Sequence, residues 1–223
     1  MMTNLFSIFD PTTYSFLSLN WFSLIIFILF TPLSYWLIPN RMKLLFSIMT
    51  NYLFKEFKPL NQKAPFLFIF IISLFLFILM NNLPGLLPYV FTASSHMSFT
   101  MTLAITMWFT LMMYGWRNNY YNLLIHLIPQ GTPLPLTSFM VIIETISNLI
   151  RPATLAIRLS ANMIAGHLLI TLLCSANSIT PFMFILPLYI FQIVLACLEI
   201  AVAFIQAYVF SVLMTLYSTE LTN

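Results

Sequence analysis

Long apolar runs separated by short polar intervals dominate the sequence. None of the runs shows the polar face that a helix on the surface of a soluble protein carries. They span residues 21–38, 66–88, 98–116, 137–173 and 181–218. Apolar runs of about 20 residues or more are typical of membrane-spanning helices. The pattern therefore predicts an all-α membrane protein in which about five membrane-embedded helices form a single domain over residues 1–223.

Residues 41–58 show a different pattern, in which apolar side chains recur at helical spacing and polar side chains occupy the opposite side. The apolar set is Met42, Leu45, Phe46, Met49, Leu53 and Phe57, and the polar set is Lys43, Ser47, Asn51, Lys55 and Lys58. This periodicity predicts an amphipathic helix on the membrane surface. A solvated connecting helix is the alternative.

The last two runs are longer than a bilayer requires. At about 1.5 Å per residue, each would form a helix of roughly 55 Å, whereas the hydrocarbon core is about 30 Å thick. Pro152 and Pro187 are possible kink sites. We expect the two runs to form a long, strongly tilted hairpin that presents a side wall to a partner. Crossing helices whose ends project into water are the alternative.

Composition excludes a soluble protein, because 61% of the residues are hydrophobic and only 6% are charged, against roughly a quarter charged in soluble domains. Five of the eight Lys and Arg residues lie between Arg41 and Lys63. By the positive-inside rule this interval stays on the side where the chain is made. The N-terminus is then expected on the far side, and five crossings return the C-terminus to the inside.

The only cysteines are Cys174 and Cys197, and each lies within an apolar run without a metal-ligand neighbour at ligand spacing. We expect buried free thiols, with a disulfide or a metal role as alternatives.

Polar and ionisable residues interrupt the last two runs. They are Glu144, Arg151, Arg158, Asn162, His167, Gln192, Glu199 and Gln206. An ionisable group at membrane depth costs at least about 2.5–3.5 kcal/mol, so each is a candidate functional residue. The simpler alternative is a set of interhelical hydrogen bonds with one buried ion pair, for example between Arg151 and Glu144.

Helical spacing sorts these residues into faces. Gln192, Glu199 and Gln206 are seven residues apart and form one polar stripe. Asn162 follows Arg158 by one turn and shares its face. His167 projects from the opposite side of an ideal helix, about 13–14 Å further along.

The chemistry of the side chains separates two roles. Glu144, His167 and Glu199 can gain and lose protons when burial and neighbouring charges adjust them. Arg158 stays charged, which suits it to attract a partner carboxylate and to repel a proton that would pass directly.

The stretch from Arg158 to His167 reads RLSANMIAGH and resembles the signature R-L-x-A-N-x-x-A-G-H of the a subunits of F-type ATP synthases. Residues 198–210 resemble the last helix of that family. Further similarity covers residues 84–89, 126–133 and 143–147, and the opening Met-Thr-Asn-Leu-Phe resembles insect mitochondrial versions.

The resemblance implies a stator subunit that lies beside a rotating ring of c subunits and supplies two offset aqueous half-channels for protons. Arg158 matches the essential arginine that faces the ring carboxylate, and His167 and Glu199 match groups of the inlet half-channel, which Glu144 is expected to line as well. Asn162 and Gln206 match polar residues near the arginine, with Gln192 as a further supporting polar residue. Arg151 is interpreted as an interfacial or structural charge near the matrix end of its helix.

The same resemblance implies a location in the mitochondrial inner membrane, with the N-terminus in the intermembrane space and the C-terminus in the matrix. The implied partners are the c-ring, the peripheral-stalk b subunit and small membrane subunits. No catalytic activity of the chain alone, no cofactor, no metal and no nucleic acid are expected. The alternatives are a purely structural subunit of a respiratory complex and a transporter, which would need an internal repeat that the sequence does not show.

Overall fold

The computed structural model of the protein describes residues 5–12, 18–25, 31–32, 37–60, 66–87, 90–118, 120–128, 133–177, 180–181, 183 and 185–222. Every regular element in these ranges is a helix, which confirms the all-α prediction. The α-helices are α2 (Arg41–Phe57), α3 (Phe66–Gly85), α4 (Met97–Asn118), α5 (Tyr120–His126), α6 (Thr137–Ala176) and α7 (Ile185–Thr222). Short 3-10 helices are η1 (Leu5–Phe9), η2 (Leu19–Phe22), η3 (Ala93–Ser95) and η4 (Leu134–Leu136).

Four of the described helices, α3, α4, α6 and α7, are long and apolar enough to cross a membrane. Their bounds follow the apolar runs closely, and α3 ends at Gly85, where the Pro84-Gly85 pair interrupts the second run. Of the first expected span, residues 21–38, the structure describes only 21–25, 31–32 and 37–38, so the prediction that this run forms one spanning helix lies partly outside the described residues.

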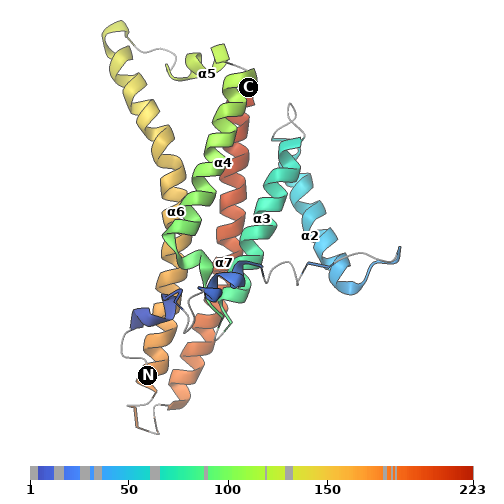
Figure 1. Ribbon diagram of the computed structural model, residues 1–223, viewed down its shortest axis with the longest axis vertical. Helices are drawn as coiled ribbons and strands as arrows, with labels where there is room; N and C mark the ends of the chain where they lie inside the picture. The colour runs from blue at the N-terminus through green and yellow to red at the C-terminus, as the bar shows by residue number, and fades with distance from the viewer. Residues whose placement is uncertain are drawn as a thin grey trace.

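The last two long helices, α6 and α7, form a hairpin (Figure 1). The helix α6 is 40 residues long and continues through Pro152 without a break. Pro187 lies in the first turn of α7, where a missing N–H removes no helical hydrogen bond. Neither proline therefore ends a helix. The predicted hairpin is confirmed, and its tilt relative to a membrane stays a prediction.

The core of the molecule lies where α4 packs on α6 and α3 packs on α7. One fully buried alanine marks each of three of these helices: Ala104 in α4, Ala156 in α6 and Ala207 in α7 are 0% exposed. Small side chains let helix backbones approach closely, which is how membrane helices associate without a hydrophobic driving force. Phe210 and Leu79 fill the space beside them.

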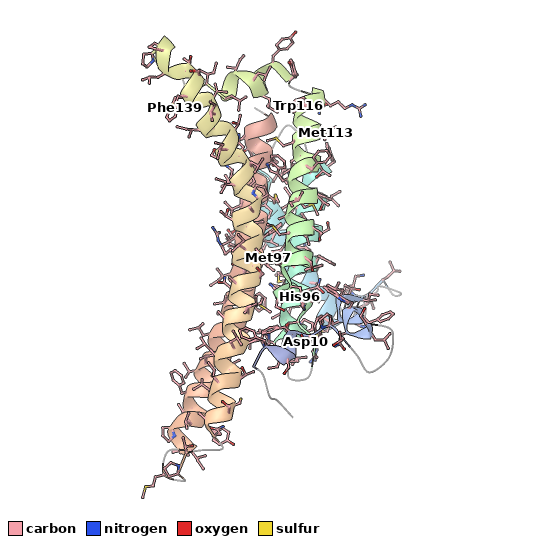
Figure 2. The ribbon with its side chains drawn as sticks, turned by 60° about the vertical axis from the view of Figure 1, so that its left-hand side comes forward. Asp10, His96, Met97, Met113, Trp116 and Phe139 are labelled. Atoms are coloured by element: carbon pink, nitrogen blue, oxygen red, sulfur yellow. The ribbon has the colours of Figure 1, made fainter. Side chains whose placement is uncertain are left out.

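The hairpin extends beyond the other long helices. Figure 2 shows the connected ends of α6 and α7 continuing past Met97, the first residue of α4. Large apolar side chains such as Leu172 and Ile193 are exposed there. This end of the hairpin thus offers an apolar wall to lipid or to another chain, as the excess length of the two runs predicts.

The amphipathic segment forms the helix α2, in agreement with its periodicity. The C-terminal half of its apolar face is the most buried part: Leu53 and Phe57 are buried, Met49 is partly buried against the core, and α2 packs against α3. Met42 and Leu45, in the first turns, are 69% and 56% exposed. This free part of the face suits contact with lipid, and the placement of α2 at a membrane surface stays a prediction.

Candidate functional site

Arg158 projects from the exposed side of α6, although its neighbours Leu155, Ala156 and Leu159 are buried in the helix packing. Among the described residues, no carboxylate lies within 4.0 Å of its guanidinium. A charged side chain at membrane depth needs a partner or water. The described part of the chain supplies no such anion beside Arg158.

Arg151, one heptad earlier on α6, is bound within the chain. Its Nη1 donates a hydrogen bond to Oε2 of Glu220 at 2.6 Å, and its Nη2 lies 3.7 Å from Oε1 of Glu144. The guanidinium also lies 5.3 Å from the ring centre of Tyr217. The ion pair between Arg151 and Glu144, expected in the simpler interpretation of the sequence, is therefore present, but both side chains are partly exposed rather than buried. Geometry now distinguishes the two arginines, which the sequence separated by motif alone.

Glu199 lies on the inward side of α7 and is only 8% exposed. Both of its carboxylate oxygens are buried without a hydrogen-bond partner among the described residues. The side chain lies against the backbone of α6 at Gly166, where an added Cβ would be 3.0 Å from Cδ and Oε1 of Glu199. The absence of a side chain at Gly166 is what lets the carboxyl group reach this position. A buried carboxyl group without a partner requires water or a proton.

His167 follows Gly166 and points toward the N-terminal part of the chain and α3. Its ring meets Phe9 of η1 edge to face, with 6.4 Å between the ring centres, and lies near the backbone of Gly85. Its Nε2 is buried and has no partner among the described residues. Arg158, by contrast, is on the exposed side of the helix. The two residues thus work in different surroundings, as their nine-residue spacing predicts.

The amide side chains tie the two long helices together. Nδ2 of Asn162 donates a hydrogen bond of 3.1 Å to Oε1 of Gln206, which is 6% exposed. Asn162 itself lies on the exposed face of α6, one turn from Arg158. Nε2 of Gln192 is buried without a partner in the described part of the chain. The stripe of Gln192, Glu199 and Gln206 therefore faces protein rather than lipid.

Two separate cavities that contain polar side chains lie along α6, and the first of them is mostly apolar. One, of about 270 Å³, lies between α6 and α7 and is lined by Glu199, Asn162 and Gly166 among apolar side chains. The other, of about 280 Å³, lies where α4, α6, α7 and the α5 segment meet. Its polar lining is Glu144, Asn148, Arg151, Tyr217 and Glu220. Each is large enough for several waters, since a water takes about 30 Å³ of liquid.

Arg158 lies between these cavities in the sequence of α6, seven residues after Arg151 and four before Asn162.

Glu144 lies apart from His167 and Glu199. It lies 23 residues from His167 on one continuous helix, a separation of about 35 Å. We expected Glu144 to line the same path as His167 and Glu199, but in the structure Glu144 lines the second cavity.

Some residues of these sites were missed in the sequence. Glu220 and Tyr217 lie at the end of α7, and their meeting with Arg151 joins positions 69 residues apart, which no local pattern reveals. Asn82, on α3, is a further buried polar residue that the candidates from the sequence do not include. It is 0% exposed and both of its amide atoms lack a partner among the described residues. The signal that selected the other candidates, a polar residue inside an apolar run, applied to Asn82 as well.

No group of three or more His, Cys, Asp or Glu side chains that could hold a metal ion occurs in the described part of the chain. Cys174 and Cys197 are free thiols. Both are exposed on the surface of the chain, so the expectation that they are buried is wrong. Apolar runs do not reveal which face of a helix is turned outward when the surroundings are lipid.

Comparison with known proteins places these residues in a family context. The family model described as ATP synthase A chain matches residues 13–219. Curated relatives named ATP synthase subunit a include those of Locusta migratoria, 53% identical, Anopheles quadrimaculatus, 52% identical, and Drosophila mauritiana, 51% identical. Each alignment covers 99% of this chain and 99% of the relative. With a fold of long apolar helices around Arg158, this chain belongs to the ATP synthase A chain family.

Proposed function

We propose that this chain forms two offset half-channels for protons beside a ring of c subunits, with Arg158 as the barrier between them. As a member of its family the chain is a proton-translocating, multi-pass subunit of the ATP synthase membrane sector in the mitochondrial inner membrane, and it is not catalytic alone. The half-channels and the coupling of proton flow to ring rotation are the proposal.

One observation carries the proposal. Two cavities, each lined by at least one carboxyl group, occur at different heights along α6, and an arginine without an ion-pair partner among the described residues lies between them. A continuous pore would need one connected cavity. Two separate cavities instead suit a path in which a proton leaves the chain, travels on a partner carboxylate and returns at another height. The exposed position of Arg158 allows that carboxylate to come from the ring.

The first cavity suits proton uptake. Glu199 lines it and can carry protons, and its unpartnered buried oxygens call for water. His167 follows the lining residue Gly166 in sequence without lining the cavity itself, and its buried Nε2 also lacks a partner among the described residues. His167 also contacts η1 near the N-terminus, at the end of the molecule opposite the C-terminus (Figure 1). We assign this cavity to the inlet half-channel from the intermembrane space. Asn162 and Gln206 hold the α6 surface beside Arg158 through their hydrogen bond, with Gln192 on the same stripe.

The second cavity suits proton release. Glu144 lines it close to the end of the molecule that holds the C-terminus, which the distribution of basic residues places in the matrix. We therefore assign Glu144 to the outlet half-channel rather than to the inlet. Release at this end and uptake at the other would let each proton cross the whole potential, worth about 2.3 kcal/mol per 100 mV.

The test compares the two arginines in assembled ATP synthase. Arg158→Ala is expected to abolish ATP synthesis driven by proton flow while the complex persists, because a neutral methyl group neither attracts the ring carboxylate nor repels a passing proton. Arg151→Gln is the matched control on the same helix and is expected to be milder. Membranes that keep ordinary coupled synthesis with Arg158→Ala would refute the proposal. Equal loss from both substitutions would place the barrier elsewhere.

A further inference from the structure

Arg151 interacts with two carboxylates that come from different helices. Glu220 of α7 holds it closely, at 2.6 Å, and Glu144 of α6 stands further off, at 3.7 Å. We call these three side chains the C-terminal ion cluster. They line one side of the cavity of about 280 Å³, together with Tyr217.

Among the described side chains, the ionisable groups that line this cavity are the cluster and Tyr217. The helix α6 contributes Glu144 and Arg151, and α7 contributes Tyr217 and Glu220. The lining that is described for α4 and α5 consists of side chains that do not ionise, such as Trp108, Met112 and Leu123. The electrostatic state of Glu144 within the cavity therefore depends chiefly on how Arg151 is oriented.

The orientation of Arg151 is set from α7. Glu220 accepts a hydrogen bond from Nη1, and the ring of Tyr217 lies 5.3 Å from the guanidinium carbon. A short charge-assisted hydrogen bond is stronger than an ion contact at a longer distance. Glu220 and Tyr217 thus draw the guanidinium toward the C-terminal end of α7, and Glu144 keeps only the longer contact with Nη2.

The distance between Glu144 and the guanidinium of Arg151 affects proton transfer. A cation in close contact favours the ionised form of a carboxylate, and this effect weakens as the two groups separate. A carboxylate that must take a proton from the ring side and pass it to water cannot be bound tightly by a guanidinium. We propose that Glu220 is a positioning residue for proton release: it engages Arg151 and thereby leaves Glu144 free to accept and release protons. This inference rests on the proposed outlet role of Glu144.

The inference makes an unusual prediction about double substitution. In Glu220→Gln, the guanidinium loses its close anionic partner and turns to Glu144, so proton flux is expected to fall by about two- to fivefold, the range that one partly exposed ion pair can produce. In Glu220→Gln with Arg151→Gln, no guanidinium remains to bind Glu144. Proton flux is then expected to recover most of the way to that of the unaltered complex, and Arg151→Gln alone is expected to be mild.

The experiment measures potential-driven proton flux through the assembled complex in vesicles, with the amount of complex determined for each variant. Glu56→Gln is the matched control, because it removes one negative charge from α2, outside this cavity. The control is expected to leave flux unchanged. A merely structural ion pair would give the same loss in Glu220→Gln, Arg151→Gln and the double variant, since each breaks the same contact. That result, with no recovery in the double variant, would overturn the inference.

A separate variant tests the outlet role of Glu144, on which this inference rests. Glu144→Gln removes the proposed outlet group itself and is expected to lower flux more than Glu220→Gln does. If Glu144→Gln left flux unchanged, the outlet assignment would fail. If Glu144→Gln lowered flux and Glu220→Gln did not, only the positioning role would fail.

Discussion

Gly166 controls how closely the Glu199 carboxyl group can approach α6, and adding a single methyl group tests this geometry. A Cβ at position 166 would lie 3.0 Å from both Cδ and Oε1 of Glu199 and 3.3 Å from its Cγ, whereas ordinary contacts begin at 3.4 Å. In Gly166→Ala the carboxyl group must therefore move by at least about 0.4 Å. Overfilling a packed site costs about 1–3 kcal/mol, and this site falls at the low end of that range, because the displaced atoms are the end of a flexible side chain that lines a cavity. If a cost of about 1 kcal/mol falls on the proton-transfer step, the rate drops roughly fivefold.

The assay is proton uptake into vesicles that contain the assembled complex, driven by a potassium diffusion potential and followed with a pH-sensitive dye. A second variant makes the test specific. Adding Glu199→Asp to Gly166→Ala removes one methylene group and withdraws the carboxyl group from the new methyl, so uptake is expected to exceed that of Gly166→Ala. Glu199→Asp alone serves as the reference. Unchanged uptake in Gly166→Ala would refute the reasoning, as would a further loss in the double variant beyond the sum of the single losses.

Three further substitutions probe the fold and the inlet. Glu199→Gln keeps the size of the side chain but cannot ionise, so proton uptake in reconstituted vesicles is expected to slow, and unchanged flux would count against the inlet assignment. Asn162→Leu leaves the buried amide of Gln206 without its 3.1 Å partner, at a cost of about 1–3 kcal/mol, and should lower the thermal midpoint of the complex; an unaltered midpoint would contradict this. Leu53→Ala, at a residue 3% exposed between α2 and α3, should cost about 2–5 kcal/mol and speed tryptic cleavage after Lys58, which exposed Met42→Ala should not do.

The long helices could be predicted from the sequence because their signal is local. A run of apolar residues without a polar face has few folds open to it in lipid, where every backbone hydrogen bond must be made within the segment. The ends of α3 and α4 fall within a few residues of the predicted bounds for this reason. The same lack of a polar face hides orientation, and so the outward position of Cys174 and Cys197 was not predictable.

The candidate site was predictable only in part. Arg158, His167 and Glu199 stand out as ionisable residues in apolar sequence, and their separate surroundings follow from helical spacing. The cavity that holds Glu144 depends instead on Glu220, which reaches it from the far end of α7. Such a contact depends on how two helices of about 60 Å lie against each other, and no periodicity along either helix contains that information.

The proposed function requires that the pairing between Arg158 and a ring carboxylate be reversible, and the position of Arg158 between two cavities is consistent with this energetic requirement. A ring carboxylate must bind the guanidinium and leave it again, using about 2.3 kcal/mol for each charge that crosses 100 mV. Two unit charges 4 Å apart attract by about 4 kcal/mol at an effective dielectric constant of 20, and by about 20 kcal/mol as an upper bound in a dry interior. The first value is of the same order as the energy that the potential supplies, whereas the second exceeds it several-fold. Arg158 therefore has to stay hydrated, and its exposed position, one turn from the cavity that begins at Asn162, provides the access to water that keeps the pairing reversible.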